Sequence, residues 1–237
     1  MSKLDSLLAL QERDLALDRL RHRRDTLPER EALSTAEARV AELAASIERA
    51  RSERDDIARE ETRFEHEAQS LAEQATAAEQ KLYSGEIASP RELQALQTDV
   101  EQLKRHQRGI EDRQIAAMER REPLDARITA LAAELATASA DATRASEALA
   151  AAETAVDQEA AGERAARDEV VAGITPELVS AYDAARVKAN GVGAASLVGN
   201  TCQGCHLTIP STEVERIKKA ADGEVSHCDN CGTILVP

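Results

Sequence analysis

Residues 33–82 read LSTAEARVAELAASIERARSERDDIAREETRFEHEAQSLAEQATAAEQKL. Apolar or small residues recur here in alternating steps of three and four positions, which is the heptad repeat of a coiled-coil helix. At roughly 1.5 Å of rise per residue, such a helix is about 75 Å long, well beyond the helices of ordinary globular domains. Two polar residues, Arg54 and Glu61, interrupt the repeat. Its positions are Leu33, Ala36, Val40, Leu43, Ile47, Ala50, Arg54, Ile57, Glu61, Phe64, Ala68, Leu71, Ala75, Ala78 and Leu82.

A second repeat of the same kind follows after a short interval. Its positions are Leu93, Leu96, Val100, Leu103, Gln107, Ile110, Gln114, Ala117, Arg121, Leu124, Ile128, Leu131, Leu135, Ala138, Ala142, Ala145, Leu149, Ala152 and Val156. The interval holds Gly85, which suits the end of one helix, and Ser89 and Pro90, which suit the start of the next. We therefore predict two long helices that form an antiparallel hairpin, with its tip near residues 84–90.

The register of this hairpin follows from the same numbers. Antiparallel partners around an apex near residue 87 or 88 have numbers that sum to 174 or 175, and this condition places Phe64 opposite Ile110. It also brings the polar positions together, with Glu61 opposite Gln114, and Arg54 opposite Arg121 with Glu122 and Asp125 nearby. Because buried polar groups are costly unless paired, we interpret this coincidence as one hydrated stretch that fixes the register. A weakly packed stretch with no special role is an equal alternative.

Two prolines and the N-terminal segment modify the hairpin. Pro28 and Pro123 each remove a helical hydrogen bond, so we expect kinks or breaks there. Residues 1–27 carry a separate leucine pattern that fits packing against residues 145–171, and a homodimer seam is the competing use. The coiled-coil domain is predicted to occupy residues 1–172.

The composition excludes several classes of protein. Only three of 237 residues are aromatic and 31% are charged, whereas the core of a large globular enzyme would carry many more rings. The formal net charge of -14 opposes adsorption to DNA or to an anionic membrane. No stretch approaches the roughly 18 apolar residues of a membrane span, and the N-terminal residues resemble no signal peptide. We expect a cytoplasmic protein without membrane association.

The four cysteines form a second domain, predicted to span residues 173–237 and to begin with a short helix up to about Ala189. They are arranged as two Cys-x2-Cys pairs separated by 22 residues, Cys202, Cys205, Cys228 and Cys231. In a reducing cytosol such pairs suit a tetrahedral four-thiolate metal site better than structural disulfides. We predict one structural zinc ion per chain, with rubredoxin-like iron as the alternative metal. Four protein ligands leave no position for water or substrate, which argues against an enzyme.

Two further groups of residues are candidates for contacts with partners. The first is a set of five cations around the cysteine module: Arg186, Lys188, Arg216, Lys218 and Lys219. Because the segment is slightly acidic overall, a solvated surface is the better interpretation of these cations, and a phosphate-binding patch the other. The second group lies at the hairpin tip and comprises Tyr83, Ser84, Gly85 and Arg91. These residues either form only the turn or contact a partner.

The sequence also resembles a known bacterial family with a long kinked coiled-coil hairpin and a four-cysteine zinc ribbon. The matching segments are Tyr83-Ser84-Gly85 through Ser89-Pro90-Arg91-Glu92-Leu93, Pro176-Glu177-Leu178 with Tyr182 and Arg186, Cys202-Gln203-Gly204-Cys205-His206-Leu207 with Ile209-Pro210, and Cys228 through Leu235. The resemblance implies that the four cysteines bind zinc. Family members in flagellated bacteria bind the alternative sigma factor sigma-54 and flagellin mRNA, and a chlamydial member is associated with sigma-54 and type III secretion.

These observations lead to two functional hypotheses. The first is a non-enzymatic, zinc-stabilised adaptor that binds other proteins, in transcription or secretion control. The alternative is a regulator that binds RNA or other nucleic acid through the ribbon region. The chain is expected to be a monomer or a homodimer.

Overall fold

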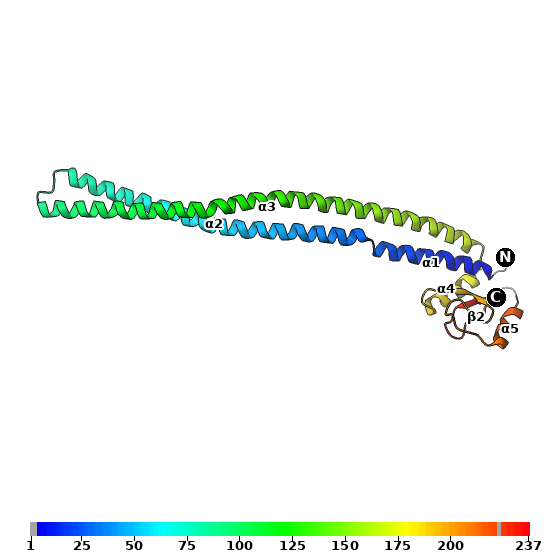
Figure 1. The fold of residues 1–237 in the computed structure, drawn as a ribbon. Helices are drawn as coiled ribbons and strands as arrows, with labels where there is room; N and C mark the ends of the chain where they lie inside the picture. Colours follow the sequence, from blue (N-terminus) through cyan, green and yellow to red (C-terminus); the bar gives the residue numbers. More distant parts are fainter. Residues whose placement is uncertain (1–3, 222–223) are drawn as a thin grey trace. The chain divides into compact units, whose positions relative to one another are not determined.

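The computed structural model describes residues 4–221 and 224–237 (Figure 1). Its helices are α1 (Asp5–Asp25), α2 (Pro28–Tyr83), α3 (Pro90–Ala172), α4 (Pro176–Lys188) and α5 (Ser211–Lys219), and its strands are β1 (Ala194–Val198), β2 (Thr201–Cys202) and β3 (Ile234–Val236). The predicted fold class, a mainly α protein with a long coiled-coil hairpin and a small C-terminal four-cysteine zinc ribbon, is confirmed. No helix among the described residues has both the length and the apolar character needed to cross a bilayer.

Contacts divide the chain into two compact units. The hairpin unit is Leu33–Ala145, and the ribbon unit combines Met1–Ala32 with Ser146–Pro237. The ends of the long helices thus belong to the same unit as the ribbon. This grouping differs from the predicted division near residue 172, which stays a prediction about which segments fold independently.

In the hairpin unit, α2 and α3 run antiparallel along one seam (Figure 1). Every position of the two predicted repeats between 33 and 145 is buried or half-buried, while most positions between them are exposed. Ala68, Leu71 and Ile110 form a buried cluster against which Phe64 and Leu103 pack. The predicted proximity of Phe64 and Ile110 is therefore confirmed.

The polar positions of the seam form ion pairs. Arg121 Nη1 lies 2.6 Å from Glu61 Oε2, and Glu61 is only 9% exposed. Arg121 Nε lies 3.6 Å from Asp125 Oδ2, and Arg54 Nε lies 4.0 Å from Asp125 Oδ1. The predicted polar stretch thus exists, with Asp125 near both arginines as expected, and Arg121 pairs in addition with Glu61. These carboxylates offset the repulsion between the two guanidinium groups.

The tip has the expected turn chemistry. Gly85 adopts a φ of +79°, a left-handed conformation that glycine takes without a steric penalty. Ser84 Oγ donates a hydrogen bond of 3.0 Å to the carbonyl of Lys81 in the last turn of α2. Pro90 is the first residue of α3, where its missing N–H has no cost.

The two prolines in the helical region act differently. A break separates α1, which ends at Asp25, from α2, which begins at Pro28, as predicted. Pro123 lies inside α3, which continues through it without interruption. The helix survives because seam packing on both sides of Pro123 offsets the backbone hydrogen bond that the proline removes.

The N-terminal helix packs within its own chain. Side chains of α1 pair with the C-terminal part of α3 through Arg13 with Glu163, Arg23 with Glu159, and Arg24 with Asp157. The predicted packing of residues 1–27 against residues 145–171 is therefore confirmed for the described residues.

The ribbon is a small three-stranded sheet with the strand order β2-β1-β3. Leu197 of β1 pairs with Cys202 of the antiparallel β2, and Ala194 of β1 pairs with Ile234 of the parallel β3. One face of the sheet packs against α1 and α4, and the opposite face packs against α5 and the cysteines. The four cysteines are thereby held on the side of the sheet that faces away from α1.

Candidate metal centre

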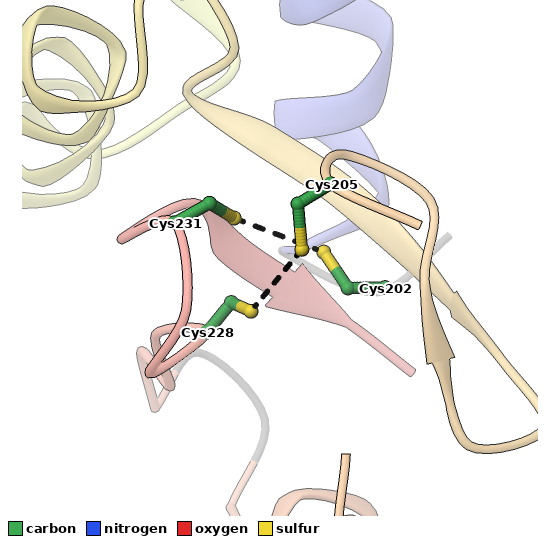
Figure 2. Close-up of side chains that lie close together, drawn as sticks. All are labelled: Cys202, Cys205, Cys228 and Cys231. Atoms are coloured by element: carbon green, nitrogen blue, oxygen red, sulfur yellow. Dashed lines mark hydrogen bonds between the residues drawn. The ribbon is translucent and has the colours of Figure 1, made fainter. Parts of the chain in front are cut away.

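The fold brings all four predicted cysteines together (Figure 2). Their sulfur atoms lie within 4.8 Å of one another. The Sγ–Sγ distance is 4.0 Å between Cys202 and Cys231 and 3.8 Å between Cys205 and Cys228. A tetrahedral metal with bonds of about 2.3 Å to sulfur has edges of about 3.8 Å, so these separations suit a metal ion and are much too long for disulfides.

Each cysteine pair sits on a turn of the same geometry. The backbone N–H of His206 donates to the carbonyl of Cys202 at 2.8 Å, and that of Gly232 donates to Cys228 at 2.8 Å. The residue after each pair is left-handed, with φ of +58° at His206 and +79° at Gly232. The two turns therefore present two sulfurs each to one point.

Hydrogen bonds and burial give the cysteine thiols different pKa values in the metal-free protein. Burial raises the pKa of the Cys202 thiol to about 12, although hydrogen bonds from the backbone N–H groups of Cys205 and Gly204 act in the opposite direction. Burial also raises the pKa of Cys228. At Cys231 burial has the same tendency, but hydrogen bonds with Thr233, Cys228 and Cys205 together outweigh it and lower the pKa to about 7. A metal ion entering the site must therefore displace thiol protons.

The donor set fits a structural metal. Cys202 and Cys228 are buried, and Cys205 and Cys231 are half-buried. Four thiolates complete a tetrahedral shell and leave no open position for water, as in structural zinc sites. The same sulfurs also suit iron, so the geometry supports a metal-binding ribbon with zinc as its expected metal.

The neighbouring histidines do not enter the cluster. His206 and His227 are both exposed. His227 Nδ1 lies 3.1 Å from the carbonyl oxygen of Gly232. Among the described residues, the cluster of possible metal ligands therefore consists of the four cysteines.

Most of the five predicted cations are engaged by local carboxylates. The pairs are Arg186 with Asp18, Arg216 with Glu213, and Lys219 with Glu215. Lys188 and Lys218 are exposed. Because carboxylates hold three of the five cations, the group offers a phosphate backbone much less positive charge than its sequence indicates.

One of the predicted tip residues, Tyr83, lines an open groove near the end of the hairpin. Tyr83 is 81% exposed, and Ser84, Gly85 and Arg91 are exposed as well. The groove has a volume of about 590 Å³ and is lined by Glu79, Leu82, Tyr83, Pro90, Leu93, Gln94, Gln97, Val100, Glu101 and Lys104. An exposed aromatic ring beside a groove lined by both apolar and polar side chains is a surface suited to protein contacts.

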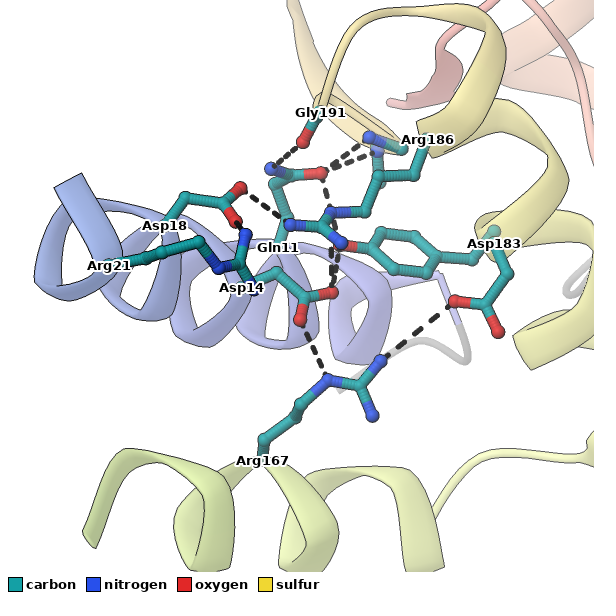
Figure 3. Close-up of polar contacts among 11 residues, drawn as sticks. Gln11, Asp14, Asp18, Arg21, Arg167, Asp183, Arg186 and Gly191 are labelled. Atoms are coloured by element: carbon teal, nitrogen blue, oxygen red, sulfur yellow. Dashed lines mark hydrogen bonds and ion pairs between the residues drawn. The ribbon is translucent and has the colours of Figure 1, made fainter. Parts of the chain in front are cut away.

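The sequence did not reveal a buried polar network between α1, α3 and α4 (Figure 3). Tyr182 is fully buried, and its hydroxyl donates to Asp14 Oδ2 at 2.7 Å. Arg167 Nε donates to Asp14 Oδ1 at 2.7 Å. Burial and the hydrogen bond to Asp14 raise the pKa of Tyr182, so its hydroxyl stays protonated. The sequence feature that could have indicated this network is Asp14, a charged residue on the same face of α1 as the leucines.

Both regions of the chain match family models. A model of the CT398-like coiled coil hairpin domain matches residues 10–190, and a model of the C4-type zinc ribbon domain matches residues 201–235. Protein Rv2229c of Mycobacterium tuberculosis is 32% identical over 231 residues, which cover 98% of this chain and 94% of that protein.

Solved structures show the same fold. A structure from Mycobacterium smegmatis has 28% sequence identity, covers 100% of both chains and gives a TM-score of 0.87. CT398 from Chlamydia trachomatis has 18% identity, covers 98% of this chain and 96% of that chain, and gives a TM-score of 0.76. At this identity the second likeness concerns the fold alone.

Proposed function

We propose that this chain, which belongs to the CT398-like coiled-coil hairpin family and also carries a C4-type zinc ribbon, is an adaptor protein. It binds other proteins and catalyses no reaction. The observation that carries the proposal is the hairpin tip, where Tyr83 is 81% exposed beside an open groove. Two helices packed along one seam expose most of their surface and enclose little volume, which favours contacts with macromolecules over capture of a small substrate.

The ribbon serves this function as a rigid module. One zinc ion per chain, held by Cys202, Cys205, Cys228 and Cys231, stabilises the two turns and the short sheet between them. A metal with four protein ligands supplies folding energy and no Lewis-acid chemistry. Four-thiolate metal sites are typical of reducing compartments, and this supports our assignment of the protein to the cytoplasm.

The partner class follows from the family resemblance of the sequence. We assign the adaptor to the transcription or secretion machinery, with sigma factors and secretion components as the first candidates. Direct RNA binding through the ribbon is the second candidate, and its support consists of the exposed Lys188 and Lys218. The pairing of Arg186, Arg216 and Lys219 with carboxylates favours the protein adaptor.

A capture experiment with matched variants tests the proposal. Tagged full-length protein is purified from its host with and without nuclease, and the bound proteins and RNA are identified in both halves. We expect the same proteins in both, and their loss in Tyr83→Ala but not in Met118→Ala, which truncates an exposed apolar residue elsewhere on the hairpin.

The other outcomes assign the function differently. Capture that disappears with nuclease, and that weakens steeply with salt, would assign the ribbon to nucleic-acid binding. Equal capture by wild type and Tyr83→Ala would rule out the tip as the contact surface.

A further inference from the structure

The sheet of the ribbon is a thin layer between two buried clusters. Its strands contain five, two and three residues. On one face, Ile234 packs in a cluster with Leu7 and Leu10 of α1. On the opposite face, Leu235 packs in a cluster that includes Cys202. Neighbouring residues of one strand thus contact the N-terminal helix and the metal site.

Gln11 fastens α1 to the segment that enters β1 (Figure 3). Its Oε1 atom accepts hydrogen bonds from the backbone N–H groups of Gly193 at 2.5 Å and Ala194 at 3.2 Å. Its Nε2 atom donates to the carbonyl of Gly191 at 3.0 Å. One buried amide therefore satisfies three backbone groups, each of which would be costly to leave unpaired.

The same segment contacts the cysteine site through a threonine. Thr233 Oγ1 donates to the carbonyl of Val192 at 3.0 Å and lies 3.3 Å from Cys231 Sγ. Val192 immediately precedes Gly193, the residue that Gln11 binds. The contact made by α1 and the contact made near Cys231 therefore fall on two consecutive residues.

This segment has little freedom to adjust. A Cβ atom on Gly193 would lie 2.5 Å from Cε2 of Tyr182 and 2.9 Å from its carbonyl oxygen. The backbone of Gly193 thus lies in close contact with α4. In addition, Gln11 accepts a hydrogen bond from the Gly193 N–H, and Thr233 donates one to the carbonyl of Val192. A shift at the cysteine turns would therefore move the groups that Gln11 binds.

We propose that docking of α1 onto the ribbon is coupled to occupancy of the four-cysteine site, so that metal loss releases α1. Three strands of this length are marginal by themselves and need both flanking layers. Without a metal, nothing covalent holds the two cysteine turns together, and their layer loosens. The strands then lose the geometry in which Gln11 and the leucines of α1 dock.

The coupling has two consequences. It is reciprocal: the factor by which the metal favours docking of α1 equals the factor by which docking favours metal binding, so a change that undocks α1 must weaken metal binding by that factor. Release also exposes Leu7 and Leu10, both 0% exposed in the docked state, and creates an apolar surface specific to the metal-free protein. Neither consequence depends on the proposed adaptor function.

Hydrogen exchange of the full chain tests whether metal removal releases α1. Wild-type protein is compared after loading with zinc and after removal of the metal by a chelator. We expect amides of residues 5–25 to exchange at least about tenfold faster without metal, because their docking partner is lost. Amides of the seam within residues 33–145 should keep their exchange rates, since they belong to the other unit.

Metal affinity tests the reverse direction. Competition with a chromogenic chelator is measured for wild type, Gln11→Ala and the control Glu12→Ala, which changes the exposed neighbouring residue of the same helix. We expect Gln11→Ala to bind zinc at least about tenfold more weakly, since three backbone groups lose their partner. Glu12→Ala should match wild type.

Either experiment can overturn the proposal. Unchanged exchange in residues 5–25 after metal removal would show that α1 docks independently of the metal. Equal zinc affinities of Gln11→Ala and Glu12→Ala would show the same. If Gln11→Ala does not accumulate as a folded protein, the exchange experiment on wild type decides alone.

Discussion

Arg121 reaches across the hairpin seam to Glu61, with 2.6 Å between Nη1 and Oε2. Both residues occupy positions of the heptad repeat that otherwise hold apolar or small side chains. The carboxylate of Glu61 is largely shielded, and its side chain is 11% exposed, while that of Arg121 is 37% exposed. An ion pair at this place costs desolvation energy and disfavours registers in which either charge lies against an apolar residue.

Removing one member of this pair should destabilise the hairpin. We expect Arg121→Ala to lower the free energy of unfolding by about 1–3 kcal/mol, because Glu61 is left shielded without its partner. The double variant Glu61→Leu/Arg121→Leu should be as stable as wild type or more stable, since the seam becomes continuous and apolar. Thermal unfolding followed by circular dichroism measures both. If the double variant is as unstable as Arg121→Ala, the ion pair stabilises the hairpin, and the interpretation that it mainly fixes the register is contradicted.

Much of the hairpin could be predicted because its information is local and periodic. Steps of three and four fix which side chains face the partner helix, and Gly85 and Pro90 fix where the chain turns. The cysteine cluster was equally accessible, since paired cysteines at short spacing have few structural uses. The ion pair of Arg121 with Glu61 was located only as a polar stretch, because spacing places residues on a face but does not select partners.

The packing of α1 against the end of α3 was predicted, but its docking onto the ribbon could not be predicted, for a different reason. Leu4, Leu7, Gln11, Asp14 and Asp18 follow the same spacing of three and four as the hairpin seams, so the segment reads as coiled coil with polar interruptions. The partners of these polar residues come from α3, α4 and the segment before β1, more than 140 residues away. No local pattern indicates such partners, and only the tertiary structure pairs them.

In the two cysteine turns, removing a glycine and introducing one should have different effects on stability. Gly232 has a φ of +79° and only an ordinary contact of 3.9 Å for an added Cβ atom, so Gly232→Ala should cost about 1–2 kcal/mol through backbone strain alone. His206 has a φ of +58° at the equivalent position, so His206→Gly should not destabilise the ribbon. Thermal unfolding of the zinc-loaded proteins compares them. Destabilisation by His206→Gly would show that its side chain contributes more than the turn.

Metal affinity should depend steeply on pH. The pKa of Cys202 is raised to about 12 and that of Cys228 is raised as well, so both thiols hold protons at pH 7, and Cys231, with a pKa of about 7, is half protonated. Binding must release these protons, about two to three in total, so the affinity should fall roughly 100-fold or more for each unit of decreasing pH. Calorimetry in buffers of different ionisation enthalpy counts the protons.

The metal-free ribbon should show the opposite trend. Folding raises the pKa of the Cys202 thiol from its ordinary value of 9.0 to about 12. This thiol therefore favours the folded state fully below pH 9 and loses that contribution as the pH rises toward about 12. We therefore expect the chelated protein to become less stable above pH 9, as followed by exchange or unfolding of the ribbon. Unchanged stability over this range would contradict the burial of Cys202.

Gly193 should be intolerant of any side chain. An alanine Cβ atom would lie 2.5 Å from Cε2 of Tyr182, and the ring is fully buried and cannot move away. We expect Gly193→Ala to cost about 3 kcal/mol or more through overpacking. Gly109→Ala is the control, because nothing lies within 4 Å of its Cβ position in α3, and it should add about 1 kcal/mol of stability. Equal unfolding temperatures of the two variants would contradict the packing described.

Pro123 is the last test, because it separates local from tertiary stabilisation of α3. The proline lies inside the helix, where it donates no hydrogen bond to the preceding turn, yet the helix continues through it. Pro123→Ala restores that bond and should raise the free energy of unfolding by about 1–3 kcal/mol. Glu122→Ala, an exposed neighbour, is the control and should stay near wild type. If Pro123→Ala instead destabilises the protein, the backbone conformation that proline imposes is needed for seam packing around Leu124. That packing would then contribute more stability than the missing backbone hydrogen bond costs.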